Sequence, residues 1–413
     1  MAGRVRHPID TVALERYISE HVPEIKVPLD VKQFGFGQSN PTYQLTAADG
    51  ARYVLRKKPA GALLSPAAHK VEREHRVIAA LSRFPSVRVP VPRPYGLCED
   101  PSVLGTPFYV MSYVRGRIFE DPAMPTASSP AERAALWRAA AEALAALHRV
   151  DADAAGLGSF GGGGRGKGGG GGGGGFYARQ LATWRAICGA QAAARDAATR
   201  EPVGAVPHMA ELVAFFGDEA RRPRDRAALV HGDYKIDNVV FEAAAPRVAG
   251  ILDWEMSTVG HPLSDLANLL HPFVSAELSA PSSSSPSSPS PPGASPDAEA
   301  EAEAVAAISH PSFLPDATPG LPTPAEVIAW YAAAAGWTPT PDEVAWACAF
   351  SVFRLAAICQ GIAARVATRQ ASSASARKHA AALKPLGEFA WVLVRREVEK
   401  RGEGTEKGAA AKL

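Results

Sequence analysis

The sequence predicts an α+β protein in which a small antiparallel β lobe is followed by a larger helical lobe. Two observations carry this prediction. Residues 31–113 read as short β segments around one helix, and from residue 132 onward most of the strong signals are helical. The length of 413 residues leaves room for two lobes, which we place at residues 1–113 and 114–413.

Four short segments of the first lobe have the composition of strands: residues 33–36, 42–45, 52–56 and 108–113. Between the last two, residues 70–81 have helical spacing, which puts Val71, His75, Ile78 and Leu81 on one face. This helix is the one expected among the strands.

The second lobe is predicted to consist mainly of six helices, at residues 131–148, 176–198, 207–221, 324–335, 341–369 and 376–399. A β hairpin with strands at residues 239–241 and 247–252 interrupts them. The apolar residues 345–364 contain Arg354 and Gln360, so we expect a buried helix there. A membrane span needs about 20 unbroken apolar residues.

Composition argues against several classes of protein. The 44 lysines and arginines nearly balance the 42 aspartates and glutamates, leaving a net charge of +2. We therefore expect no overall positive potential that would bind the nucleic-acid backbone. A local basic pocket is compatible with this net charge. The four cysteines include no C-x-x-C pair, which argues against a zinc ribbon and suits a reducing compartment. The first residues lack the apolar core of a signal peptide.

Low-complexity stretches are expected to be disordered. Residues 161–175 are glycine except for Arg165 and Lys167, and residues 281–296 are almost wholly serine and proline. We place the disordered inserts at about 161–175 and 279–308, with a flexible tail at about 401–413. The glycine tract lacks the fixed glycine spacing of a phosphate-binding loop.

The residues that suggest chemistry are concentrated in 229–265. His231-Gly232-Asp233 follows a short apolar segment, Asn238 lies five residues beyond Asp233, and Asp253 ends an apolar run. Phosphoryl transfer needs one carboxylate that accepts the proton of an attacking hydroxyl. It also needs hard oxygen ligands for Mg²⁺, which a second carboxylate and an amide oxygen supply. Lys235 could neutralise charge on the transferred group.

The spacing Asp-x-x-x-x-Asn matches the catalytic loop of protein kinases. The whole segment, LVHGDYKIDNVVFEAAAPRVAGILDWEMSTVGHPLSD, resembles the aminoglycoside phosphotransferase family, in the branch that animals fuse to acyl-CoA dehydrogenases. FGFGQSNPTYQL, YVLRKKPAGALL, VEREHRVIAAL and PFYVMSYVRGRIF agree, so that the resemblance runs from about residue 31 to about 270. It implies a two-lobed, protein-kinase-like fold with its catalytic loop at residues 231–253. It also implies transfer of the ATP γ-phosphate to a small-molecule hydroxyl with Mg²⁺.

The resemblance also assigns roles to residues. Asp233 is similar to the family's catalytic base, while Asn238 and Asp253 resemble its magnesium ligands. Glu74 looks like the helix carboxylate that pairs with a strand cation, and that cation is Arg56 where the family usually has lysine. The nucleotide would also meet a glycine flap and a hinge, formed by Gly35, Gly37, Gln38, Ser39 and Asn40 and by Met111, Tyr113 and Val114.

Several alternatives stay open. Glu72 is the rival of Glu74 as the partner of Arg56, and the sequence does not choose between ATP and GTP. His231 is interpreted as a structural histidine that holds the loop. Because arginine replaces lysine, the chain could be a catalytically inactive pseudokinase that binds a nucleotide or an acyl group. A protein kinase proper is disfavoured, since Trp-Glu rather than Phe-Gly follows Asp253.

The acceptor suggested by the resemblance is a hydroxylated fatty acid or a hydroxyacyl-CoA. The chain ends in Ala411-Lys412-Leu413, which is close to the Ser-Lys-Leu peroxisomal address. We therefore expect a peroxisomal import receptor as partner and a peroxisomal location, or a cytoplasmic one if the ending is accidental. No nucleic acid or membrane partner is expected.

Overall fold

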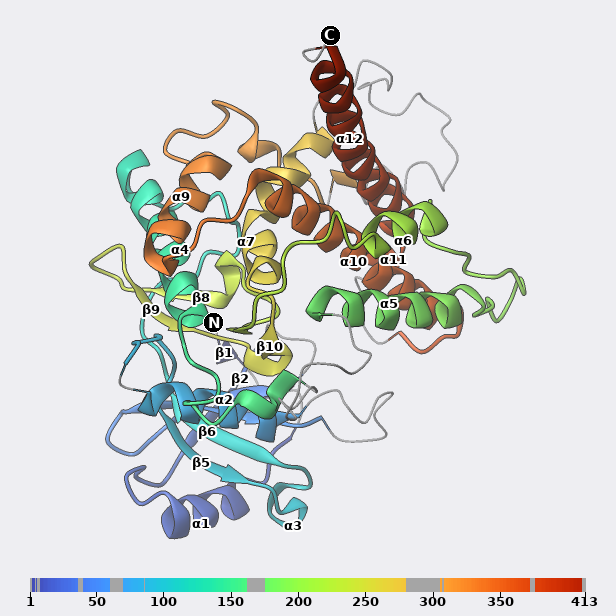
Figure 1. Ribbon diagram of the computed structural model, residues 1–413. Helices are drawn as coiled ribbons and strands as arrows, with labels where there is room; N and C mark the ends of the chain where they lie inside the picture. Colours follow the sequence, from blue (N-terminus) through green and yellow to red (C-terminus); the bar gives the residue numbers. More distant parts are fainter. Residues whose placement is uncertain are drawn as a thin grey trace. The chain divides into compact units, whose positions relative to one another are not determined.

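The computed structural model (Figure 1) describes the chain with several gaps. The described residues are 2–3, 5, 8–35, 40–59, 70–84, 86–161, 175–279, 305–306, 308–371 and 376–410, with the backbone alone for 401–410. The chain divides into two compact units. The first comprises Met1–Asp121, Ala135–Gly166 and Ala228–Val259, and the second Pro122–Ala134, Lys167–Ala227 and Gly260–Leu413.

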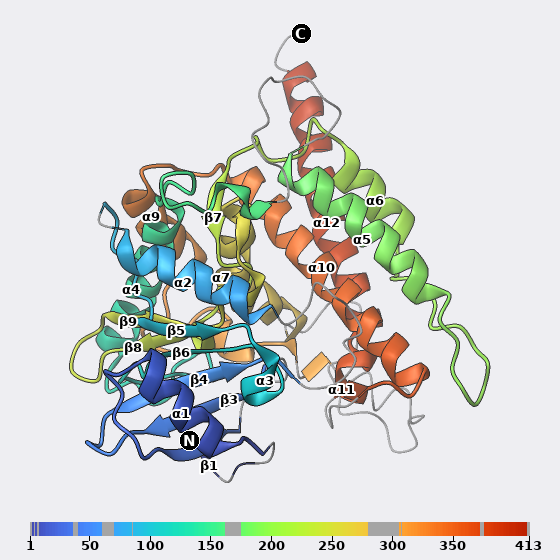
Figure 2. The same ribbon diagram turned by 90° about the horizontal axis from the view of Figure 1, so that it is seen from below.

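The first unit contains a six-stranded antiparallel sheet, which confirms the predicted fold class. Its strands are β1 (Ala2–Gly3), β2 (Asp30–Phe34), β3 (Thr42–Thr46), β4 (Arg52–Lys57), β5 (Pro94–Cys98) and β6 (Phe108–Ser112), in the order β1-β2-β3-β4-β6-β5. Three helices accompany the sheet: α1 (Thr11–His21), α2 (Val71–Arg83) and the short α3 (Pro101–Leu104). In both Figure 1 and Figure 2 strands β5 and β6 lie between α1 and α2.

Burial on both faces explains the composition of β4. Tyr53 and Leu55 belong to the hydrophobic cluster that includes Leu14 and Ile18 of α1. Because side chains alternate along a strand, Arg56 faces the other side of the sheet, where α2 lies. The register fixes its place, since Arg56 pairs with Thr42 of β3 and with Tyr109 of β6.

The remaining elements of the first unit surround the chemical motif. They are most of α4 (Pro130–His148), η1 (Gly158–Gly161), β7 (Ala228–Val230), η2 (Ile236–Asn238), β8 (Val239–Phe241), β9 (Val248–Ile251), η3 (Trp254–Met256) and β10 (Thr258–Gly260). β8 and β9 form the predicted hairpin, with Val239 opposite Ile251. β7 pairs with β10.

The second unit is helical. It contains α5 (Phe176–Ala192), α6 (Met209–Gly217), α7 (Leu263–Ala276), η4 (Glu277–Ser279), η5 (Pro311–Phe313), α9 (Pro324–Ala335), α10 (Pro341–Ala367), α11 (Ala376–Ala381) and α12 (Leu383–Ala410). α10 packs against α5, α7, α11 and α12. Among the described residues it is the one helix long and apolar enough to cross a membrane. However, 56% of its most apolar window is buried, as expected of a core helix.

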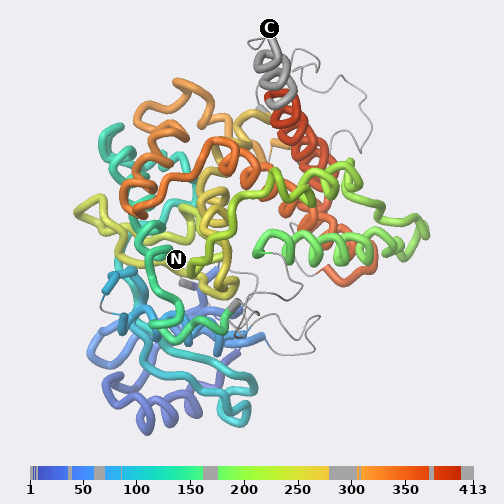
Figure 3. The backbone as a smooth tube through the Cα atoms, in the orientation of Figure 1, coloured from blue at the N-terminus to red at the C-terminus, as the bar shows by residue number. Residues whose placement is uncertain are grey.

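Other sequence expectations differ from the structure. The predicted helix at residues 376–399 is two helices, because the chain turns at Ala382. The backbone of 401–410 continues α12, and residues 411–413 lie outside the description, so a flexible tail there stays a prediction. Residues 162–174 and 280–304, where we expect disorder, are likewise not described and are grey in Figure 3. The boundary at residue 113 also stays a prediction.

Candidate active site

The loop after β7 is held by a buried histidine. The side chain of His231 is fully buried, and its Nε2 donates to the carbonyl oxygen of Leu252 at 2.8 Å. Its Nδ1 accepts from the backbone N–H of Asp233 at 3.2 Å. His231 therefore joins the Asp233 loop to the end of β9 and has no ring nitrogen left for chemistry. This geometry confirms its interpretation as a structural residue.

Gly232 is required by the same loop. Its φ is +88°, and a Cβ atom there would lie 2.5 Å from the carbonyl oxygen of Met256 and 2.8 Å from its Cβ. An L side chain would thus be both strained and in collision with η3. Glycine at this position lets the loop pass close to the segment that follows Asp253, so the two halves of the motif stay together.

Asp233 and Asn238 are in direct contact. The Nδ2 atom of Asn238 donates to the carbonyl oxygen of Asp233 at 2.8 Å and to its Oδ2 at 3.1 Å. The backbone oxygen of Asn238 accepts from the N–H of Leu252 at 2.9 Å. The carboxylate of Asp233 is 41% exposed, so a hydroxyl group could reach it.

Lys235 lies beside the same carboxylate. Its Nζ is 3.7 Å from Oδ2 of Asp233 and 3.2 Å from Oδ2 of Asp237. Burial alone would lower the pKa of Lys235, but these two carboxylates outweigh burial and raise it above its ordinary value. The ammonium group therefore stays charged at neutral pH, next to the position where an incoming hydroxyl would be deprotonated.

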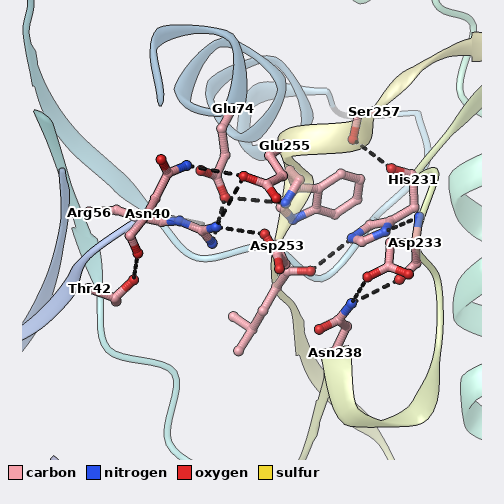
Figure 4. Close-up of polar contacts among 12 residues, drawn as sticks. Asn40, Thr42, Arg56, Glu74, His231, Asp233, Asn238, Asp253, Glu255 and Ser257 are labelled. Atoms are coloured by element: carbon pink, nitrogen blue, oxygen red, sulfur yellow. Dashed lines mark hydrogen bonds and ion pairs between the residues drawn. The ribbon is translucent and has the colours of Figure 1, made fainter. Parts of the chain in front are cut away.

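Asp253 meets the cation on β4. Oδ1 of Asp253 is 2.6 Å from Nη2 of Arg56, and Nη1 of Arg56 is 3.0 Å from Oε1 of Glu74 (Figure 4). Asp253 has a φ of +66°, so the chain turns sharply where β9 ends and η3 begins. Glu74, which also accepts from the N–H of Trp254 at 3.2 Å, is the partner of Arg56. The structure thus decides between Glu74 and its rival Glu72.

Two further polar side chains complete this cluster. Nη2 of Arg56 lies 3.8 Å from Oε2 of Glu255, and Nδ2 of Asn40 donates to the same oxygen at 3.2 Å. Sequence reasoning assigned no role to Glu255, although its position two residues after Asp253 was the available signal. Asn40, at the end of the predicted flap, is only 2% exposed.

The cluster is electrostatically acidic, because the carboxylates of Glu74, Asp253 and Glu255 surround one guanidinium. Burial would lower the pKa of Arg56, but Glu74 and Asp253 raise it above its ordinary value, so Arg56 is always charged. Burial raises the pKa of Glu74 to about 7, against the opposing effect of Arg56. An excess of negative charge around a solvent-accessible carboxylate, Asp253, favours a divalent cation.

The residues could hold magnesium. The carboxylate of Asp253 is 34% exposed. Asn238 is held near it, because its backbone oxygen accepts from the N–H of Leu252, the residue before Asp253. One carboxylate and one amide oxygen, with water and phosphate oxygens, make up the hard ligand set that Mg²⁺ takes. Within the described part of the chain, no group of three or more His, Cys, Asp and Glu side chains is arranged to hold a metal.

The structure brings together most of the predicted site residues but not all. One cluster consists of Asn40, Arg56, Glu74, Asp253 and Glu255, and Asp233 and Asn238 form a second (Figure 4). Lys235 lies beside Asp233, and Leu252 joins the two clusters through its bonds with His231 and Asn238. Gly35 follows β2, while Gly37, Gln38 and Ser39 lie outside the described residues.

The predicted hinge residues lie at the end of β6. Met111 is buried within that strand. The guanidinium of Arg52 sits 4.1 Å above the ring of Tyr113. A Cβ on Gly250 of β9 would come within 3.0 Å of Val114, so these two segments pack closely. No interaction with the Arg56 cluster is seen for these three residues among the described contacts, and their role in binding adenine stays a prediction.

Comparison with known proteins identifies relatives along nearly the whole chain. A family model described as "Phosphotransferase enzyme family" matches residues 30–283. The chain is 37% identical over 389 residues to acyl-CoA dehydrogenase family member 11 of Gallus gallus, covering 93% of this chain and 43% of that protein. It is 35% identical over 387 residues to family member 10 of Mus musculus, with 93% and 31% covered. The chain therefore spans less than half the length of these relatives.

Solved structures agree. A Ralstonia eutropha protein assigned as an aminoglycoside phosphotransferase is 33% identical, with a TM-score of 0.69 over 94% of this chain and 99% of that one. Aminoglycoside 2'-phosphotransferase-IIIa, at 14% identity, has a TM-score of 0.51 over 95% and 99%. The second likeness shows the fold alone, which is the predicted kinase-like α+β fold. The matching family model and the relatives, together with this fold, show that the chain belongs to the phosphotransferase enzyme family.

Proposed function

We propose that the chain is a kinase that transfers the γ-phosphate of ATP to a hydroxyl group of a small molecule. The observation that carries this proposal is the joining of two polar clusters at the end of β9. On one side Asp253 pairs with Arg56, which also pairs with Glu74. On the other side Leu252 bonds to Asn238 and, through His231, to the Asp233 loop. These are the parts that phosphoryl transfer requires: a proton acceptor, metal ligands and cations.

Each residue then has a distinct role. Asp233 accepts the proton of the acceptor hydroxyl while the oxygen of that hydroxyl bonds to the γ-phosphorus of ATP. The bond between the γ-phosphorus and the oxygen of ADP breaks, and ADP departs. Asn238 and Asp253 would hold Mg²⁺, which when bound neutralises negative charge on the phosphates. Lys235, 3.7 Å from Asp233, stabilises charge on the transferred phosphoryl group.

Nucleotide binding by the flap and the hinge follows from the family. Gly35, Gly37, Gln38, Ser39 and Asn40 would cover the phosphates, and the backbone of Met111, Tyr113 and Val114 would meet the purine. The fold likeness to the streptomycin–ATP ternary complex of APH(2")-IIa, with a TM-score of 0.52 at 13% identity, supports ATP as the donor. In that complex both ATP and streptomycin are bound.

The acceptor that we propose is a hydroxylated fatty acid or a hydroxyacyl-CoA. Its support is that curated relatives are named as members of the acyl-CoA dehydrogenase family. Arg115 and Arg117, which follow the hinge, could meet a CoA phosphate. A peroxisomal location, with an import receptor reading Ala411-Lys412-Leu413, would place the protein among such substrates.

The direct test is incubation with magnesium ATP and a panel of hydroxy fatty acids, hydroxyacyl-CoAs, amino alcohols and aminoglycosides. Mass spectrometry should detect the added mass of one phosphate on a hydroxyacyl compound. The Asp233→Asn variant should give no product while keeping its fold. Absence of magnesium-dependent turnover across the panel would refute the proposal.

A pseudokinase is the second candidate, and the observation that favours it is Arg56 itself. Both terminal nitrogens of its guanidinium are already within ion-pair distance of carboxylates. Such a protein would bind ATP without transferring phosphate, and Asp233→Asn would leave its properties unchanged. Loss of turnover in that variant, with ATP binding retained, decides for the kinase.

A further inference from the structure

A large cavity lies on the face of α2 that points away from Glu74. Its volume is about 1070 Å³, and all of its lining residues belong to the first unit. The helix contributes Arg73, Arg76 and Arg83 from one face, while Glu74 lies on the opposite face and binds Arg56. This volume is close to the upper end of the range for small-molecule sites, about 300–1,000 Å³.

The charged side chains that line this α2 cavity are mainly basic. Lys70, Arg73, Arg76 and Arg83 line it, against the two carboxylates of Glu72 and Glu99. Lys70 and Arg83 are exposed, and neither has an ion-pair partner in the part of the chain that the structure describes. Such unpaired cations around a concave space attract an anion.

Two of the arginines are fixed in position. The guanidinium of Arg73 lies 4.0 Å and that of Arg76 5.2 Å from the centre of the Phe160 ring. Arg73 donates to the carbonyl oxygens of Phe160 at 2.7 Å and Ser257 at 3.0 Å, and Arg76 donates to that of Gly156 at 2.9 Å. The two guanidinium groups therefore lie against the same Phe160 ring, and hydrogen bonds to neutral carbonyl oxygens hold them there. Burial, and then Arg76, lower the pKa of Arg73, in agreement with this crowding.

Glu72 also lines the cavity, but its Oε2 is closed off from solvent and so from a ligand. What the lining presents is therefore a set of forked guanidinium cations, which suit a phosphate.

From this geometry we infer that the α2 cavity binds a phosphorylated small molecule, such as a sugar phosphate. The site is separate from the Asp233–Asp253 cluster and does not depend on phosphoryl transfer. Arg73 connects the two, because its side chain reaches Ser257, four residues beyond Asp253. An occupied cavity would hold α2, and with it Glu74, in the position that pairs with Arg56.

Ribose 5-phosphate is the probe, followed by fluorescence. Ser86 lines the cavity and is exposed, whereas the four native cysteines are all buried, so a label on a Ser86→Cys variant is selective. Ribose 5-phosphate should change the fluorescence saturably, inorganic phosphate should bind more weakly, and ribose should not bind. Hydrogen exchange of the α2 amides should slow on binding.

Matched variants test the chemistry. Lys70→Gln combined with Arg83→Gln should weaken ribose 5-phosphate at least tenfold, the loss expected from one or more charge-assisted contacts. Arg16→Gln, which removes an exposed charge on α1, should leave the affinity unchanged. The inference is overturned if neither phosphate compound binds, or if the double variant binds both as the wild type does.

Discussion

Arg56 and Asp253 are 197 residues apart in the chain, and their side chains meet at 2.6 Å. The other terminal nitrogen of the same guanidinium lies 3.0 Å from Glu74. One side chain thus joins strand β4, helix α2 and the end of β9. Arginine is suited to this position because its planar fork presents two nitrogens in fixed directions, whereas lysine presents a single one.

Arg56→Met should therefore abolish most activity and destabilise the protein. Removing the guanidinium leaves Glu74, which is 1% exposed, as a buried unpaired carboxylate, at a cost of about 3 kcal/mol. Arg56→Lys keeps the charge but spans only one carboxylate, so about a tenfold loss in kcat/KM is expected. Kinetics with the acceptor found in the metabolite screen, and urea unfolding, measure both effects.

Lys32→Met is the control for this pair of variants. Lys32 lies on the neighbouring strand β2 with its side chain 52% exposed, and it should behave as the wild type in both assays. Full activity in Arg56→Met would show that the ion pairs of Arg56 serve the fold alone.

Asp253→Asn should separate metal binding from folding. The carboxamide keeps the size of the side chain but lacks the charge that a divalent cation needs, so roughly a 100-fold loss of turnover is expected. Raising the Mg²⁺ concentration should recover part of it. Activity measured as a function of Mg²⁺ concentration gives the concentration at half-maximal activity for each protein. Asp30→Asn, an exposed position on β2, is the control. An unchanged Mg²⁺ dependence would remove Asp253 from the metal site.

Local motifs in the sequence predict one half of the site. Asp233 and Asn238 are five residues apart, so a tight loop brings them together whatever surrounds it. The other half depends on long-range order. The contact between Asn40 and Glu255 spans 215 residues, a separation that no local pattern contains. Family resemblance supplied Glu74, but spacing alone could not choose it over Glu72.

The fold shows the same division. The predicted bounds of α9 match the structure, since Pro324 at its start and Gly336 after its end are strong local signals. Helix α7 was missed, because Pro272 lies inside it and its apolar residues follow directly on the catalytic motif. Helix α1 was also missed, although Asp10 caps it by accepting from the N–H of Ala13 at 2.9 Å.

Gly232→Ala should damage both stability and activity. The added methyl group would need a φ near +88° and would lie 2.5 Å from the carbonyl oxygen of Met256. Strain and overpacking together should cost about 3 kcal/mol. Gly50→Ala is a matched control, because its φ is +79° but nothing lies within 4 Å of the added atom. It should cost only about 1 kcal/mol. Thermal unfolding and turnover would distinguish collision from strain, and equal effects would contradict the packing argument.

Stability should fall as the pH drops below neutrality, and His271 in α7 should contribute to the fall. Burial, together with the charges of His310 and Arg354, lowers the pKa of His271 to about 4. In the unfolded chain the ring has its ordinary pKa of about 6.5. Between pH 6.5 and pH 4 the unfolded chain therefore binds a proton at His271 that the folded chain does not. The contribution of His271 is thus fully present above pH 6.5 and is lost progressively toward pH 4.

The change amounts to at most about 3 kcal/mol, which corresponds to a few degrees in Tm for a chain of this size. His271→Asn removes the titrating group, so its Tm should fall less between pH 7 and pH 5 than that of the wild type. This comparison isolates His271 from His75 and His261, whose pKa values burial also lowers. Parallel Tm curves for the two proteins would mean that His271 is protonated as readily in the folded chain as in the unfolded one.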